Sequence, residues 1–310
     1  MENIKRAVVT GATGVVGVAL IKELISQNIE TLVLTRKNGR IDKIPTHPLV
    51  KFKICSLEEL SDFNITDEKY DVFFHLGWAG TYGEERNDLK KQELNITYTL
   101  DAVDLAHRLG CNTFIATGSQ AENGTLEYGQ KVSDASPENP ISAYGKAKLQ
   151  AARESRKLCK KLSLRHSWCR ILSVYGPSDA PYTMVMSTLL KMLRNEDCNF
   201  TPAEQQWDYI YSGDVAKALL GIAENGIDGA IYPIGSGKTK LLKDYILEMA
   251  KITETTGKCN FGAIDYYPNQ PMYLCADIDN LLNDTGFAPE TNFKDGIQKT
   301  IEYIKENNLM

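Results

Sequence analysis

Tyr144 and Lys148 are the two residues whose types and spacing point most directly to chemistry. They stand four positions apart within residues 140–148, so on a helix their side chains share one face, one turn apart. An ammonium group beside a phenol favours the phenolate, which would bring the pKa of Tyr144 down from its ordinary ~10 toward neutral pH. A Tyr and a Lys at this spacing are also common on solvated helices, so the catalytic interpretation depends on neighbouring motifs.

Ser119 would supply a second hydroxyl. Residues 112–120 form an apolar run that ends in polar residues, and the carboxyl end of a strand is where an open α/β sheet binds its ligands. A serine there, together with the Tyr144 phenol, would aim two donors at one substrate oxygen. That arrangement stabilises the alkoxide charge that develops when a ketone accepts a hydride. The alternative is that Ser119 simply caps the strand end.

A glycine-rich turn near the N-terminus predicts a dinucleotide site. Residues 6–10 have the pattern of a short buried strand, and residues 18–27 have the apolar period of a helix. Three glycines lie between the strand and the helix. Gly11 would permit a tight turn, Gly14 would let a pyrophosphate approach the backbone, and Gly17 would allow the helix to pack closely. A turn without a ligand is the alternative. Further cofactor contacts are expected from this turn at Thr13, Val15 and Val16.

The end of the second predicted strand bears on the choice of cofactor. A site for NAD usually has an acidic residue there that accepts from the ribose 2'-hydroxyl. This chain has Thr35, Arg36 and Lys37 instead. Because a guanidinium can bind a 2'-phosphate, Arg36 favours NADP(H), with NAD(H) possible. Arg36 as an exposed strand-end cation is the alternative.

Residues 71–77 predict a further buried strand. It ends in Gly77, where the backbone would pass close to a cofactor. His75 lies inside this apolar run, and we interpret it as a buried, hydrogen-bonded core residue. Trp78 opens a loop that would line the substrate cleft. Other expected cofactor contacts are Leu76, Gly77, Leu172 and Val174.

The composition is that of an ordinary globular protein. The 310 residues are 43% hydrophobic and 24% charged, and the net charge of -5 gives no support for nucleic-acid binding. Seven cysteines, an odd number without a Cys-x-x-Cys pair, indicate reduced thiols in a cytoplasmic protein. No apolar run reaches the ~18 residues that a membrane-spanning helix needs. No metal site is predicted.

Five motifs in register resemble those of the extended short-chain dehydrogenase/reductase family, the nucleotide-sugar epimerases, dehydratases and reductases. They are the glycine turn at residues 11–17, Ser119, Tyr144-x-x-x-Lys148, Tyr175-Gly176-Pro177 and residues 207–216. The resemblance covers nearly the whole chain. It implies a doubly wound parallel α/β sheet of the Rossmann type, with a smaller C-terminal α/β substrate domain. It also implies catalysis by Ser119, Tyr144 and Lys148.

The resemblance also implies partners and boundaries. The substrate would be a nucleoside-diphosphate sugar, and the chain would form a homodimer. We expect residues 1–172 to bind the dinucleotide, with residues 207–234 returning to that domain, and residues 173–206 and 235–310 to form the substrate-binding lobe. Substrate contacts are expected at Trp78, Gln120, Ser173, Tyr175 and Gln206.

Departures from the family pattern narrow the chemistry. Family 4,6-dehydratases place Asp-Glu directly after the Ser or Thr as an acid–base pair, whereas this chain has Gln120 and Ala121, so dehydration is not expected. Ser173 stands where the family commonly has an Asn that touches the substrate, and Trp207 where it often has Arg. Family 4-epimerases retain NAD and usually have an acidic residue at the end of the second strand, whereas this chain has Arg36 there.

We therefore expect an NADPH-dependent reductase of a 4-keto nucleoside-diphosphate sugar. Hydride would go to C4 of the sugar while Tyr144 protonates the oxygen, Ser119 holds that oxygen, and Lys148 contacts the nicotinamide ribose. The first alternative is an NAD-dependent nucleotide-sugar C4 epimerase. The second is a non-catalytic NADP(H)-binding sensor.

Overall fold

A parallel sheet is the centre of the molecule. The computed structural model describes residues 4–64, 68–268 and 270–310. The sheet has seven strands in the order β11-β6-β5-β4-β1-β2-β3, and each neighbouring pair runs parallel. The order reverses between β1 and β4, which confirms the predicted doubly wound α/β fold. The strands are β1 (Arg6–Thr10), β2 (Glu30–Thr35), β3 (Val50–Ile54), β4 (Val72–His75), β5 (Thr113–Ser119), β6 (Arg165–Ile171) and β11 (Ala230–Ile234).

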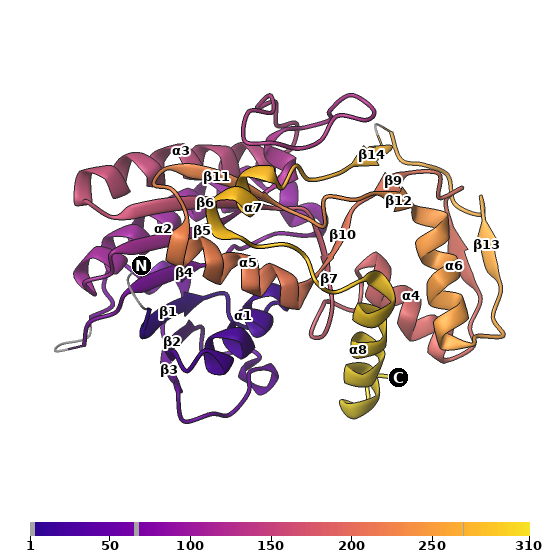
Figure 1. Ribbon diagram of the computed structural model, residues 1–310, viewed down its shortest axis with the longest axis horizontal. Helices are drawn as coiled ribbons and strands as arrows, with labels where there is room; N and C mark the ends of the chain where they lie inside the picture. The colour runs from indigo at the N-terminus through magenta and orange to yellow at the C-terminus, as the bar shows by residue number, and fades with distance from the viewer. Residues whose placement is uncertain (1–3, 65–67, 269) are drawn as a thin grey trace.

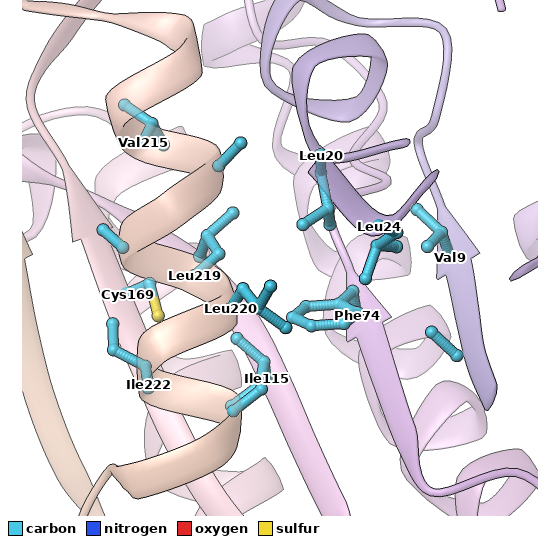
Figure 2. Close-up of a cluster of buried hydrophobic side chains, with 14 of the residues drawn as sticks. Val9, Leu20, Leu24, Phe74, Ile115, Cys169, Val215, Leu219, Leu220 and Ile222 are labelled. Carbon is cyan, nitrogen blue, oxygen red and sulfur yellow. The ribbon is translucent and has the colours of Figure 1, made fainter. Parts of the chain in front are cut away.

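The central strands are continuous apolar runs because helices cover both faces of the sheet. Helices α1, α5 and α7 lie on one face, and α2 and α3 pack together on the other (Figure 1). Figure 2 shows the first of these interfaces, where Leu20 and Leu24 from α1 meet Leu219 and Leu220 from α5 over Phe74. The helices are α1 (Val15–Ser26), α2 (Leu89–Arg108), α3 (Ala143–Leu162), α5 (Ser212–Asn225) and α7 (Asp279–Thr285).

Helix α3 carries two of the predicted catalytic residues, and its start is well defined. Ser142 precedes it in extended conformation, and its side chain accepts a hydrogen bond from the Gly145 amide at 3.0 Å. This cap satisfies one of the otherwise unpaired amides of the first turn. Tyr144 and Lys148 therefore lie in the first two turns, near the carboxyl ends of the strands.

The C-terminal region forms a second, smaller core. Helices α4, α6 and α8 stand together away from the sheet, connected to it through β7 and β10 (Figure 1). Its elements are β7 (Ser173–Tyr175), α4 (Met184–Leu193), β8 (Cys198–Phe200), β9 (Gln206–Trp207), β10 (Tyr209–Tyr211), β12 (Lys240–Leu241), α6 (Leu242–Thr253), β13 (Cys259–Phe261), β14 (Tyr273–Leu274) and α8 (Phe293–Glu306). In the part of the chain that the structure describes, four 3-10 helices lie in connecting segments: η1 (Ile41–Lys43), η2 (Leu57–Glu59), η3 (Gly83–Asn87) and η4 (Gln120–Glu122).

The chain passes back and forth between these two regions. Strand β11 completes the large sheet beside β6, and α5 packs against α1. Helix α7 lies within residues 235–310, which we expected in the substrate-binding lobe, but it packs against α5 with Leu281 in the core of the sheet. That part of the expected boundary is wrong, because Leu281 and Phe287 cover apolar surface on α5 that the sequence alone does not reveal. The rest of the division stays a proposal.

No helix among residues 4–64, 68–268 and 270–310 has the length and apolar character needed to cross a bilayer. The same residues contain no cluster of three or more His, Cys, Asp or Glu side chains arranged to hold a metal ion. All seven cysteines are free thiols, six of them buried.

Candidate active site

The glycine turn after β1 is shaped by close backbone contacts. Gly11 has φ of +70°, and a Cβ there would lie 2.5 Å from the backbone of Leu76 and Gly77. A Cβ on Gly17 would lie 2.3 Å from the Gly11 carbonyl oxygen. A side chain at Gly14 would meet nothing nearer than 3.6 Å, so the space beside Gly14 is free for a ligand. Gly14 precedes α1 without a side-chain cap, which leaves the first amides of that helix available to an anion.

A cleft opens where the strand order reverses, between the loops that follow β1 and β4. Its volume is about 460 Å³, within the range of ligand sites. A glycine turn, a helix N-terminus and a cleft of this size together fit a dinucleotide. Its lining includes Gly11, Ala12, Thr13, Thr35, Arg36, Gly39, Ser56, Glu58, Gly77, Trp78, Gly80 and Tyr98. Val15 and Val16, the first residues of α1, follow the turn directly.

The β2 end of this cleft is cationic. Thr35 is buried at the last position of β2, and Arg36 lines the cleft with its side chain exposed. Lys37 and Arg40 follow on the same exposed segment. Two carboxylates line the cleft as well, Glu58 from η2 and Glu85 from η3. In NAD sites a carboxylate at this place accepts a hydrogen bond from the ribose 2'-hydroxyl. Here the same place holds the Thr35 hydroxyl and the Arg36 guanidinium.

Lys148 is buried beside the cleft. Its Nζ donates to the Thr117 carbonyl oxygen at 2.6 Å and lies 3.7 Å from the centre of the Trp78 ring. Burial lowers the pKa of Lys148 to about 7, while the charge of Glu122 acts in the opposite direction. The indole face favours the ammonium form over the neutral amine. The charge of Lys148 is thus opposed by burial and supported by the indole face and by Glu122.

Tyr144 lies between Ser119 and a cation that the sequence analysis did not identify. The Tyr144 side chain is only 8% exposed, and its phenol is hydrogen-bonded to the Ser119 side chain. Burial raises the pKa of Tyr144, while the Arg86 guanidinium and the Ser119 hydrogen bond lower it. The Arg86 Cζ stands 4.3 Å from the centre of the Tyr144 ring, whereas Lys148 Nζ is 5.9 Å away. The expected low pKa of Tyr144 is therefore wrong for this structure, and the nearer cation is Arg86.

A buried charge network supports the site from behind. Glu122 and Arg170 have no exposed surface, and their Oε2 and Nε atoms are 3.0 Å apart. The Trp168 indole donates to both Glu122 oxygens, at 3.0 and 3.1 Å, and the Ser119 amide donates to Glu122 Oε1 at 2.7 Å. Ser119 Oγ in turn donates to Gln120 Oε1 at 2.9 Å. This network fixes the strand end that presents the Ser119 hydroxyl.

Several residues predicted to bind substrate have other partners. Trp78 lies under Lys148 in the dinucleotide cleft, and its indole donates to Gln92. Ser173 accepts from the Trp207 indole at 2.7 Å, so the two positions where this chain departs from the family pattern are bonded to each other. Gln206 precedes Trp207 on β9 and is partly exposed.

Tyr175 is the clearest correction on the substrate side. Its side chain is 1% exposed, packs among the aromatic rings of the C-terminal core and donates to the Phe293 carbonyl oxygen at 3.4 Å. The Tyr175 side chain is thus a core residue and does not reach the cleft. Among the expected cofactor contacts, Leu172 is buried in a small cluster with Val132, and Val174 and Leu76 pack on the sheet core.

Comparison with known proteins decides the family. The model of the NAD dependent epimerase/dehydratase family matches residues 7–235. The chain belongs to this family. It is accordingly an enzyme of the extended short-chain dehydrogenase/reductase type, whose relatives are nucleotide-sugar epimerases and dehydratases.

Two similar family members share about a quarter of the sequence over almost the full length. CDP-abequose synthase from Salmonella muenchen is 26% identical over 96% of this chain and 97% of its own. The putative UDP-glucose 4-epimerase from Methanocaldococcus jannaschii is 25% identical over 97% and 98%. UDP-glucose 4-epimerase from Thermotoga maritima has the same fold, with a TM-score of 0.88 and 21% identity over 98% and 99% of the two chains.

The epimerase/dehydratase pattern led to Ser119, Tyr144 and Lys148, and the structure brings these three side chains together. It did not lead to Arg86 or to the Glu122–Arg170 pair. For Glu122 a signal existed, because Ser119 and Glu122 have the spacing of a capping box, and both of its hydrogen bonds are formed. His75 was interpreted as a hydrogen-bonded core residue. That is confirmed by its 3% exposure and its contacts with Thr10 at 3.0 Å and Thr99 at 3.4 Å.

Proposed function

We propose that the enzyme is an NADPH-dependent reductase of a 4-keto nucleoside-diphosphate sugar, with Ser119, Tyr144 and Lys148 as its catalytic residues. The observation that carries the proposal is that one proton carrier, Tyr144, stands at the strand ends beside an amide and a methyl group at positions 120 and 121. Reduction of a ketone needs one proton at one oxygen, whereas dehydration needs an acid and a base at two different carbons.

Each catalytic side chain has a part that its surroundings support. A nicotinamide cofactor bound in the cleft would supply the hydride. Tyr144 gives its proton to the C4 oxygen, and its raised pKa keeps the phenol protonated before the reaction. Ser119 holds the same oxygen through its hydroxyl. Lys148, fixed by Thr117 and Trp78, faces the region where the cofactor ribose would lie.

Glu122 is the nearest buried carboxylate, and it does not act as a second proton carrier in this proposal. Both of its oxygens accept from Trp168, one is paired with Arg170, and it has no exposed surface. A carboxylate with these partners and no exposed surface does not reach a substrate. Gln120 and Ala121 replace the Asp-Glu pair of the dehydratases, and among the described side chains Glu122 does not take over the role of that pair as proton carrier.

The cofactor preference rests on the β2 end of the cleft. Arg36 lines the cleft, with Lys37 and Arg40 on the same exposed segment. A 2'-phosphate there would gain charge-assisted hydrogen bonds that a 2'-hydroxyl cannot make. This favours NADP(H). NAD(H) remains the alternative, since solved relatives such as UDP-glucuronic acid 4-epimerase from Bacillus cereus are complexes with NAD.

The family relatives favour two substrate chemistries. The relative named CDP-abequose synthase forms a CDP-sugar, which places CDP-sugars among the substrates to be tested. The relative named as a UDP-glucose 4-epimerase favours C4 epimerisation, which the same Ser119, Tyr144 and Lys148 would serve. A non-catalytic NADP(H) sensor is the third candidate, and the presence of a proton carrier beside a dinucleotide cleft gives it no support. Homodimer formation stays a prediction from the family resemblance.

One experiment separates these functions. Purified protein is mixed with NADPH and 4-keto CDP-, dTDP- and UDP-sugars in turn, and the loss of NADPH absorbance is followed against product formed. The reductase proposal expects one NADPH consumed per sugar, with NADH less effective. In a parallel reaction with the corresponding 4-hydroxy nucleoside-diphosphate sugars, copurifying NAD and inversion at C4 without net consumption of NADPH would replace the reductase with the epimerase. Tight NADP(H) binding with no turnover of any sugar would favour the sensor.

A further inference from the structure

The loop between β4 and α2 places two of its side chains on other parts of the site. Arg86, in η3, lies with its guanidinium over the Tyr144 ring at 4.3 Å. Tyr82, just before η3, stacks on Tyr182 with ring centres 4.1 Å apart. Tyr182 precedes α4 in the C-terminal region. The loop thus touches the proton carrier from one end and the substrate side from the other.

Buried amides of α2 fix this loop. Gln92 is 1% exposed, and its Nε2 donates to the carbonyl oxygens of Gly80 at 2.8 Å and Glu85 at 3.0 Å. Asn95, equally buried, brackets Ala79, accepting from its amide at 2.8 Å and donating to its carbonyl oxygen at 2.9 Å. The position of Arg86 is therefore set by the protein itself and is formed in advance of any ligand.

The Arg86 charge is not neutralised by an acidic partner. Within residues 4–64, 68–268 and 270–310, none of the ion pairs includes Arg86. The neighbouring Glu85 is paired with Lys91 instead. Arg86 Nη1 donates to the Thr81 carbonyl oxygen at 3.3 Å, a contact that orients the guanidinium and leaves its charge in place. An unpaired cation over an aromatic face stabilises negative charge on that ring.

We propose that Arg86 is a positioning residue of the reaction, whose guanidinium stabilises the Tyr144 phenolate that remains after proton transfer. The inference rests on the proposed function in one respect, that Tyr144 is the proton carrier. It does not depend on whether the enzyme reduces or epimerises. The other ionisable groups facing Tyr144 are Lys148 from α3, Glu122 from η4 and, beyond Lys148, the buried His75 of β4.

The role has a signature in the pH dependence of activity. When Tyr144 acts as an acid, activity falls as pH rises through its pKa, and when Tyr144 acts as a base, activity rises through the same pKa. Removing the Arg86 charge removes a cause that lowers the pKa of Tyr144. The limb of the pH profile that Tyr144 controls therefore moves to higher pH, whether Tyr144 acts as an acid or as a base. The expected shift is about one unit for a charge at this distance.

The experiment titrates Tyr144 directly and needs no sugar. Tyrosinate absorbance is measured against pH with saturating NADP+ and separately with NAD+, and the curve of the matched Tyr144→Phe protein is subtracted. We compare Arg86→Ala, Arg86→Lys and the control Lys90→Ala, which changes an exposed lysine of α2. The expected midpoint is about one pH unit higher in Arg86→Ala, largely restored in Arg86→Lys and unchanged in Lys90→Ala.

Equal midpoints in the wild type and Arg86→Ala would overturn the proposal. If Arg86→Ala is poorly folded by its thermal transition, Arg86→Gln, which keeps a donor for Thr81, takes its place. Once a substrate is known, an Arg86→Ala enzyme that raises KM with its pH limb unmoved would make Arg86 a substrate contact and also overturn it. A shifted midpoint without NADPH-dependent reduction would retain the role of Arg86 and reject the reductase.

Discussion

Two buried tyrosines, Tyr144 and Tyr175, have opposite surroundings. Tyr144 is 8% exposed and has Arg86 over its ring, with Lys148 and Ser119 close by. Tyr175 is 1% exposed and is enclosed by the rings of residues 209, 211 and 293, with centres 5.0–6.1 Å away. Burial raises the pKa of both phenols, but only Tyr144 has an arginine and a serine that oppose the rise.

The contrast extends to the regions around the two residues. Glu122, Lys148 and Arg170 are at most 4% exposed, and all of them lie within a few residues or contacts of Tyr144. The core around Tyr175 is built from aliphatic and aromatic side chains of α4, α6 and α8. Buried charges cost free energy unless they are paired, and beside Tyr144 the protein keeps the Glu122–Arg170 pair and Lys148 despite that cost. The aromatic region supplies shape.

The sharpest test of this contrast is the same substitution at both positions. Tyr144→Phe should lower kcat by about 10²–10⁴-fold because the proton carrier is lost, while cofactor binding is kept. Tyr175→Phe should keep kcat within a few-fold and cost about 0.5–1.5 kcal/mol of stability through its hydrogen bond to Phe293. Steady-state kinetics and urea unfolding measure the two effects. Equal losses of activity would remove the distinction between the regions.

Breaking the charge network behind Ser119 should destabilise the protein strongly. Glu122→Gln leaves Arg170 buried without its carboxylate, which should cost about 3–5 kcal/mol. The matched control is Glu290→Gln, which disrupts the exposed pair between Lys217 and Glu290 and should change stability by less than about 1 kcal/mol. Denaturant midpoints distinguish the two, and similar midpoints would contradict the assignment of the pair as a buried support.

Acid should affect the charged region before the aromatic one. Burial lowers the pKa of His75 to about 3 and that of His166 to about 4, below the ~6.5 of an unfolded chain. Because the unfolded state then binds more protons, stability is lost as pH falls from about 6.5, by about 2 kcal/mol for each histidine at pH 5. All four histidines precede residue 172.

Hydrogen exchange at pH 7 and pH 5 gives the measurement. Amides of β4 and β6 should lose protection at pH 5 more than those of α6 and α8, and His75→Gln should reduce the difference. Loss of protection first in α6 and α8 would reverse the contrast between the two regions.

The smallest expected effect concerns the cofactor end of the charged region. Arg36→Ala should weaken NADP+ binding about tenfold, the loss of roughly one charge-assisted hydrogen bond, and leave NAD+ binding nearly as it was. Lys53→Ala, an exposed cation of β3, is the control. Isothermal titration of both nucleotides measures the ratio. If the NADP+ affinity of Arg36→Ala were unchanged, Arg36 would not be the residue that binds the 2'-phosphate.

Local patterns were sufficient for the strand–glycine–helix turn and for the placement of Ser119, Tyr144 and Lys148. The turn is local in sequence, and Tyr144 and Lys148 share a helix. The partners that set their charge are distant, since Arg86 is 58 positions before Tyr144 and Glu122 meets Arg170 across 48 positions. Tyr175 shows the same limit, because a strand-end tyrosine can turn either into the cleft or into the core. Its neighbours from α8 decide that choice.

The placement of α7 has a consequence for how the chain folds. A chain that stops at residue 235 would contain all seven strands of the large sheet and the complete glycine turn, but not Leu281 and Phe287, which are 0% and 9% exposed against the helix that follows β10. That helix would show an apolar stripe to water. The C-terminal segment is therefore needed to seal the first half of the molecule, and the two halves should melt in a single transition.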